Sequence, residues 1–188
     1  TSIFPVVESV FDPKVNLVSS LIAPANIDDN TAAKAQELAL QVLEAMDFVG
    51  LMAVELFLDS DGDLLVNEVA PRTHNSGHHT IEANKTSQFA QHLRAVVGLP
   101  LGDVSLLHNA AGMINLLGAA DAYGTPVYEG LSEAQSIPGV HPHLYGKSEV
   151  KPYRKMGHVT VTGSDIDLVQ ERLLKLRESI CVSGTKEK

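Results

Sequence analysis

Two carboxylates, Glu55 and Glu68, lie in short segments of alternating apolar residues that an Asp61-Gly62 dipeptide separates. Asp-Gly between two such segments predicts a β-hairpin with a two-residue turn. Counting outward from this turn places Glu55 opposite Glu68. Like charges opposite each other destabilise a sheet, so we expect a cation between them, and oxygen ligands favour Mg²⁺ or Mn²⁺ over zinc. The alternative interpretation is a pair of solvent-facing residues at a sheet edge.

A polar loop, residues 71–80, follows the second of these segments. Its three imidazoles, His74, His78 and His79, could together bind zinc. However, their spacing is irregular, no cysteine accompanies them, and the nearby carboxylates favour a harder cation. A surface loop without a ligand is the other alternative. In an ideal strand the side chains of Asn67 and Glu68 point to opposite faces. Asn67 can therefore join Glu68 in one site only where a bulge or a twist distorts the strand.

Four cations, Lys147, Lys151, Arg154 and Lys155, lie within nine residues of a chain whose net charge is −9. Such a cluster can hold a phosphate monoester dianion. A solvated basic loop is the alternative interpretation. Nucleic acid is a weaker candidate, because one short cluster on an acidic protein is a small electrostatic footprint.

The elements that must position these residues follow from periodicity and from turn residues. We expect a helix over 31–46 capped by Asp29 or Asn30, a helix from Thr86 or Ser87 to about Val97, a short helix over 131–135 and a helix over 165–180 capped by Ser164. We expect strands over 3–10 and 15–21, joined at Asp12-Pro13, and over 51–58, 64–69, 110–117, 142–145 and 158–162. Residues 183–188 read as a disordered tail.

Composition limits the class of protein. The chain has 188 residues, 44% of them hydrophobic, and one cysteine, Cys181, which we expect in a helix or in its frayed end. A single cysteine excludes an internal disulfide framework and suits a reducing compartment. No apolar run reaches the length of a membrane span, and no signal-peptide pattern opens the chain. We therefore expect a cytoplasmic protein that binds neither membrane nor nucleic acid.

The segment 53–80 contains the residues Ala-Val-Glu-Leu-Phe and then Asn-Glu-Val-Ala-Pro-Arg-Thr-His-Asn-Ser-Gly-His-His. It resembles the metal and substrate strands of ATP-grasp enzymes, and more narrowly the N5-carboxyaminoimidazole ribonucleotide synthetases, the ATPase subunits of phosphoribosylaminoimidazole carboxylase. Further matches are Ser87-Gln88-Phe89, His92-Leu93-Arg94-Ala95, Tyr145-Gly146-Lys147 and the run from Arg154 to His158. The resemblance covers nearly the whole chain.

The resemblance implies an α+β fold, in which the carboxy-terminal lobe of an ATP-grasp domain (residues 1–105) precedes a small β-rich domain (106–188). It also implies that the amino-terminal lobe of the enzyme is absent, and that the 188 residues are inactive alone. The intact enzyme would be a ligase, also classed with the lyases. It would use ATP and bicarbonate to carboxylate 5-aminoimidazole ribonucleotide through carboxyphosphate, and it would be a homodimer.

The resemblance also implies roles for individual residues. Glu55 and Glu68 would hold Mg²⁺, or Mn²⁺, against ATP, with Asn67 beside them. Arg72, His74, Asn75 and Ser76 would face the carboxyphosphate and the ribonucleotide. Lys147 and Arg154, with Lys155 nearby, would hold the ribonucleotide phosphate. His79 departs from the family, which often has an aromatic residue there. Two alternatives remain open: another ATP-grasp ligase, and a binding or dimerisation module without turnover.

Overall fold

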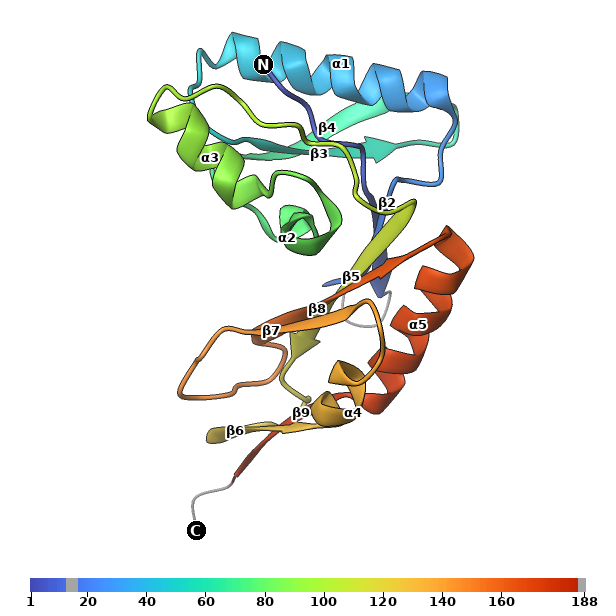
Figure 1. Cartoon of the computed structure of the whole chain (residues 1–188), viewed down its shortest axis with the longest axis vertical. Coiled ribbons are helices and arrows are strands. Elements are labelled where there is room, and N and C mark those ends of the chain that lie inside the picture. Colours follow the sequence, from blue (N-terminus) through green and yellow to red (C-terminus); the bar gives the residue numbers. More distant parts are fainter. Residues whose placement is uncertain (13–16, 186–188) are drawn as a thin grey trace. The chain divides into compact units, whose positions relative to one another are not determined.

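The computed structural model describes residues 1–12 and 17–185, which form two compact units (Figure 1). The first unit contains Thr1–Glu8 and Ala23–Leu107, and the second contains Ser9–Ile22 and the chain from His108 onward. An early segment of the sequence therefore groups with its later half. The domain bounds 1–105 and 106–188 stay a prediction. The expected joint at Pro13 and the last three residues of the expected tail lie outside the described residues.

The first unit consists of one long helix, one hairpin and a series of shorter helical segments. In chain order these are α1 (Asp29–Ala45), β3 (Ala53–Leu58), β4 (Leu64–Ala70), the 3-10 helix η1 (Asn75–Gly77), α2 (Thr80–Ala83) and α3 (Gln88–Val96). In Figure 1, α1 lies along the hairpin. The expected helices over 31–46 and 87–97 are confirmed.

Side-chain caps determine where the two longer helices of this unit begin. Asp28 caps α1, because its Oδ1 accepts a hydrogen bond from the backbone N–H of Thr31 at 3.0 Å. The prediction of Asp29 or Asn30 as the cap was therefore wrong by one or two residues. Ser87, one of the two residues predicted for the start of α3, caps it by accepting from the backbone N–H of Ala90 at 3.2 Å. Both caps satisfy donors that the first helical turn leaves without an intrahelical partner.

The hairpin pairs Glu55 with Glu68, as predicted, but its turn and its register differ from the prediction. Its turn is not a two-residue Asp-Gly turn, because Leu58 pairs with Leu64 and the Asp59 N–H donates to the Asp63 carbonyl at 3.0 Å. A register shift follows at Glu55/Leu56, where one residue of β3 faces two of β4. The longer loop and this bulge offset each other, so the count from the sequence reaches the correct pair.

The second unit is built on a five-stranded sheet. Its elements are β1 (Glu8–Asp12), β2 (Leu17–Ala23), β5 (Ala110–Leu117), β6 (Thr125–Glu129), α4 (Leu131–Gln135), β7 (Val140–Leu144), β8 (Lys155–Gly163), α5 (Ile166–Ser179) and β9 (Cys181–Thr185). The sheet has the order β1-β2-β5-β8-β7, and β6 pairs with β9. Within this sheet, β8 is antiparallel to both β5 and β7.

The core of the second unit lies between α5 and the sheet. Buried side chains of β5, β8 and α5, including Ile114, Val159 and Leu173, belong to one cluster. Gly112 of β5 permits the close approach of α5, because a Cβ atom there would lie 2.5 Å from the Leu173 Cδ1 atom. Of the expected elements, β5 and α4 have the predicted bounds, and α5 begins after Asp165, which caps it in place of Ser164.

Three expectations for the chain ends need correction. Residues 1–7 form no strand, since β1 begins at Glu8, and Pro5 has no N–H to donate to a ladder. Cys181 lies exposed in β9 and not in a helix. Residues 183–185 belong to that strand and not to a tail, because they pair with β6 more than 50 residues earlier. No helix among the described residues is long and apolar enough to cross a membrane.

Candidate functional site

Glu55 and Glu68 lie side by side where the bulge interrupts the hairpin. The extra residue of the bulge is Asn67, and a bulge can direct successive side chains to one side of a sheet. Asn67 Nδ2 accordingly lies 3.5 Å from Glu55 Oε2 and donates to it. The sequence argument that Asn67 requires a local bulge is thus confirmed, although its role in binding stays a prediction. The site places two carboxylates and one amide on the same face.

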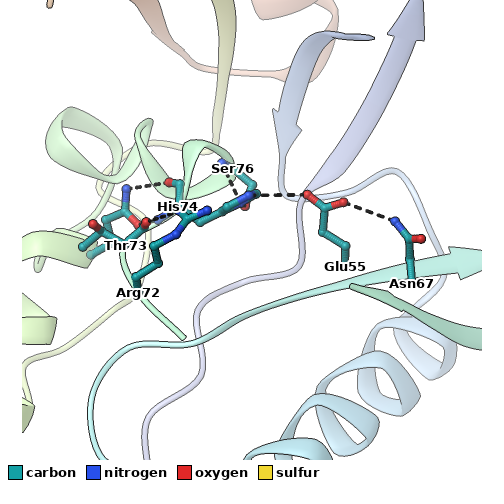
Figure 2. Close-up of polar contacts among 7 residues, drawn as sticks. Glu55, Asn67, Arg72, Thr73, His74 and Ser76 are labelled. Atoms are coloured by element: carbon teal, nitrogen blue, oxygen red, sulfur yellow. Dashed lines mark hydrogen bonds and ion pairs between the residues drawn. The ribbon is translucent and has the colours of Figure 1, made fainter. Parts of the chain in front are cut away.

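His74 completes this group of side chains from the loop that follows β4. Ligand atoms of Glu55, Glu68 and His74 all lie within 4.8 Å of one another. His74 Nε2 is 3.8 Å from Glu55 Oε1, and Figure 2 shows Glu55 between His74 and Asn67. Two carboxylates with an imidazole nitrogen and an amide beside them have the chemistry of a divalent-cation site.

The protonation of the His74 ring follows from its neighbour Ser76. The Ser76 backbone N–H donates to His74 Nδ1 at 3.4 Å, and the Ser76 hydroxyl lies 2.9 Å from the same nitrogen. A backbone N–H can only donate, so Nδ1 carries a lone pair and the proton of the neutral ring is on Nε2. That N–H faces the Glu55 carboxylate. At 3.8 Å from Glu55 Oε1, this nitrogen lies beside the carboxylate without being hydrogen-bonded to it.

The other predicted residues of the loop lie close by in the chain. Arg72 Nη1 donates to the Thr73 carbonyl at 2.9 Å, which folds its exposed side chain back onto the loop (Figure 2). Asn75 and Ser76 begin η1, for which His74 is the cap. The structure thus brings His74 and Asn67 to Glu55 and places Ser76 against His74, whereas Arg72 contacts the Thr73 carbonyl of its own loop.

The interpretation of the three histidines as a zinc site was wrong. His79 is 4% exposed, and its Nδ1 contacts the Ser76 carbonyl at 3.0 Å. Burial lowers the pKa of His79 to about 4, so this ring is neutral and structural. His78 Nδ1 contacts the Gln88 side chain. Within residues 1–12 and 17–185, the one group of potential ligands close enough to share an ion is Glu55, Glu68 and His74.

Gln88 is the residue of this region that the sequence argument did not assign. It is 2% exposed, and its side chain contacts both His74 and His78. The signal available in the sequence was a long amide at the first position of a helix directly after its cap. That signal does not reveal which segment the amide would meet.

The predicted phosphate cluster lies in the second unit, at the connection between β7 and β8. The pKa of Lys147 is lowered, first by burial and then by the charges of Arg154 and Lys155. Its ammonium donates to the Lys155 carbonyl and lies 5.6 Å from the centre of the Tyr145 ring. Arg154 Nη1 donates to the Glu149 carbonyl at 2.8 Å. Three of the four cations therefore lie close enough to repel one another.

Lys151 behaves differently from the other three cations. Its ammonium lies 3.3 Å from the Glu149 carboxylate, and both side chains are more than half exposed. Its charge is thus already partnered at the surface. The structure separates Lys151 from the group of Lys147, Arg154 and Lys155, which the sequence alone did not do.

Comparisons with known proteins find matches to both the earlier and the later part of the chain. The pattern of the ATP-grasp domain matches residues 1–89, and that of the phosphoribosylaminoimidazole carboxylase C-terminal domain matches residues 111–172. The chain is 45% identical to the chloroplastic phosphoribosylaminoimidazole carboxylase of Vigna aconitifolia over 179 residues, which are 94% of this chain and 32% of that protein.

Solved structures give the same result. The Thermotoga maritima N5-carboxyaminoimidazole ribonucleotide synthetase is 48% identical, with a TM-score of 0.86 over 88% of this chain and 46% of that one. The Aspergillus clavatus N5-carboxyaminoimidazole synthase, solved with ADP and 5-aminoimidazole ribonucleotide, is 35% identical, with a TM-score of 0.82 over 93% of this chain and 47% of that one. The chain thus spans less than half the length of each of these three proteins.

Proposed function

We propose, from the premise that this chain belongs to the N5-carboxyaminoimidazole ribonucleotide synthetase family of ATP-grasp proteins, that it forms part of an ATP-dependent carboxylase. In the proposed reaction bicarbonate attacks the γ-phosphorus of ATP, and ADP leaves. The resulting carboxyphosphate yields CO₂ and phosphate. The exocyclic amine of 5-aminoimidazole ribonucleotide then bonds to the CO₂ carbon and loses a proton. The juxtaposition of Glu55, Glu68 and His74 carries this proposal.

The hairpin carboxylates suit a hard divalent cation. Glu55 and Glu68 would hold Mg²⁺, or Mn²⁺, through oxygen atoms, which both ions prefer. When bound, such an ion neutralises charge on the phosphates during phosphoryl transfer. Asn67 orients Glu55 by donating to its Oε2. His74 Nε2 lies 3.8 Å from the other oxygen of Glu55, so each carboxylate oxygen has a polar neighbour.

The loop after β4 offers groups for the bicarbonate-derived intermediate. Arg72, His74, Asn75 and Ser76 are the residues that we assign to it. Arg72 would balance the charge of a phosphoryl or carboxyl group, because a guanidinium makes charge-assisted hydrogen bonds to such oxygens. His74 would hydrogen-bond the intermediate or carry a proton. Its fixed ring supports this assignment, since an oriented group loses less entropy when it acts.

Lys147, Arg154 and Lys155 would hold the 5′-phosphate of the ribonucleotide. The lowered pKa of Lys147 supports this assignment, because it reflects mutual repulsion of cations as well as burial. A phosphate dianion would relieve that repulsion. Lys151 is left out, because Glu149 already balances its charge.

The proposal extends to the setting of the enzyme. We place it in the cytoplasm, consistent with a single cysteine in 188 residues. We also propose a homodimer. The many large apolar side chains that are exposed on the described surface, such as Leu93 of α3 and Val97 directly after it, support self-association.

A chimera provides the experiment for the proposed reaction. This chain would replace the matching 46% of the Thermotoga maritima enzyme, which supplies the remainder of an ATP-grasp site. We expect ADP release that depends on 5-aminoimidazole ribonucleotide and bicarbonate. A chimera whose ADP release does not depend on this ribonucleotide would instead indicate another ATP-grasp ligase.

The substitution Glu68→Gln tests the carboxylate pair in this chimera. We expect it to reduce turnover at least about a hundredfold, because it removes one charge that balances the cation. The same substitution should weaken Mn²⁺ binding to the 188-residue chain, measured by electron paramagnetic resonance. The control is Asp61→Asn, which removes an exposed carboxylate of the same hairpin outside the group. Turnover and Mn²⁺ affinity unchanged by Glu68→Gln would contradict the assignment.

A further inference from the structure

The buried amide of Gln88 pairs with both backbone groups of His74. Gln88 Oε1 accepts from the His74 N–H at 2.9 Å, and Gln88 Nε2 donates to the His74 carbonyl at 2.8 Å. Gln88 is the first residue of α3 and is 2% exposed. One side chain therefore occupies both hydrogen-bonding groups of the residue that places its ring beside Glu55. Loss of a buried pair of this kind leaves polar groups unsatisfied.

These two partners also determine the orientation of the amide. A backbone N–H can only donate and a carbonyl can only accept, so oxygen and nitrogen of the Gln88 amide cannot be exchanged. The same Nε2 lies 2.8 Å from His78 Nδ1. Because Nε2 can only donate, His78 Nδ1 must carry a lone pair. The neutral ring of His78 is therefore protonated on Nε2.

Neighbouring groups hold Gln88 in this position. The Thr80 hydroxyl accepts from the Gln88 backbone N–H at 2.9 Å and donates to the Gly77 carbonyl at 2.6 Å. The His78 ring also stacks on Phe89, the next residue of α3, at 5.7 Å between centroids. The first residues of α3 thus contact the loop through hydrogen bonds and through the stacked rings of His78 and Phe89.

Gly77 leaves the space that the amide occupies. A Cβ atom on Gly77 would lie 2.6 Å from Gln88 Oε1. The amide cannot move away without breaking its bonds to His74 and His78. The role of Gly77 at this position is therefore steric.

We propose that Gln88 is the positioning residue of this loop. It fixes the backbone at His74 and sets His78 as a neutral ring that donates through Nε2. This inference deepens the proposed function where it concerns His74, but its test needs no turnover. Failure of the tautomer test and failure of the carboxylase assay are therefore separate outcomes.

The experiment measures the imidazole nitrogens of the ¹⁵N-labelled 188-residue chain by NMR at neutral pH. The signals of His78 are assigned by their loss in His78→Gln. We expect Nδ1 of His78 to resonate as an unprotonated, pyridine-type nitrogen and Nε2 as a protonated, pyrrole-type nitrogen. A wild-type ring protonated on Nδ1 would overturn the proposal.

The isosteric substitution Gln88→Glu makes the test specific. A carboxylate can still accept from the His74 N–H, but it cannot donate to His78, so we expect the proton to move to Nδ1. The control is Gln91→Glu on the same helix. Gln91 is also buried and also pairs with both backbone groups of one residue, Gly102, at 2.8 and 3.2 Å. It should leave the His78 signals unchanged.

A second variant keeps the test decisive if Gln88→Glu does not fold. Gly77→Ala should displace the amide and convert His78 to a mixture of tautomers. A folded variant of either kind that keeps the wild-type His78 pattern overturns the proposal. An equal change in Gln91→Glu also overturns it, because the effect would then not depend on the contact with His78.

Discussion

At the scale of single residues, His79 makes the stability of the first unit depend on pH. Its pKa is about 4 in the folded chain because burial disfavours the charged ring, and about 6.5 when unfolded. Between these values the unfolded chain binds more protons. The stabilisation is therefore complete above about pH 6.5 and is lost as the pH falls toward 4. The difference corresponds to about 3 kcal/mol.

His79→Asn tests this dependence. An asparagine amide can still donate to the Ser76 carbonyl, but it does not titrate. We expect a smaller loss of unfolding free energy between pH 6.5 and 4 than in the wild type. The measurement is urea unfolding followed through the amide NMR signals of α3, since the chain has no tryptophan. Equal pH slopes in the two proteins would show that His79 does not titrate on unfolding.

Lys147 and Arg154 give a second prediction at this scale. In the active chimera, substituting either by alanine should raise the KM for the ribonucleotide about tenfold to a thousandfold, because a charge-assisted phosphate contact is lost. The KM for ATP should stay nearly constant. Lys151→Ala is the matched control, because Glu149 already pairs with that cation. A parallel rise in the KM for ATP would mean that the cluster holds a different phosphate.

At the scale of elements, the turn of the carboxylate hairpin depends on Asp59. Its Oδ1 accepts from the backbone N–H groups of Asp61 and Asp63, both at 2.9 Å. Asp59→Ala should therefore destabilise the hairpin by about 1 kcal/mol, whereas Asp59→Asn keeps an acceptor and should cost less. Amide exchange of β3 and β4 measures the effect. Asp61→Ala is the control, and an equal loss there would contradict the role of Asp59.

At the scale of the whole molecule, the two units differ in how they are stabilised. Among the described residues of the first unit, the buried apolar side chains are all alanines: Ala23, Ala35, Ala70 and Ala83. The second unit buries a cluster of larger side chains around β5, β8 and α5. Buried apolar area is the main source of stability. The second unit should therefore be the more stable of the two.

Hydrogen exchange of the 188-residue chain can test this difference. We expect hydrogen-bonded amides of β5 and β8 to exchange about tenfold or more slowly than those of β3 and β4, after correction for intrinsic rates. Apolar side chains of the hairpin such as Phe57 and Leu65 are more than half exposed, so they contribute little buried area that would slow exchange in β3 and β4. Equal protection in both sheets would contradict it.

Features that local chemistry controls could be predicted from the residues alone. The bounds of β5, an apolar run, and of α4, a short helix before Pro138-Gly139, were predicted, and the start of α3 was predicted at Thr86 or Ser87. The pairing of Glu55 with Glu68 was also predicted, although the longer turn and the bulge at Asn67 compensated for each other. Such features depend on a few neighbouring residues, whose patterns repeat in any chain.

Contacts between groups far apart in the chain could not be predicted, and the fold reveals them. Gln88 reaches His74 across 14 residues, and β9 pairs with β6 across more than 50. Burial keeps the His79 ring neutral, and the ion pair with Glu149 distinguishes Lys151 from the other cations of the predicted phosphate cluster. These outcomes depend on packing between segments and on the loss of water around each group. Neither quantity is contained in the spacing of residues along the chain.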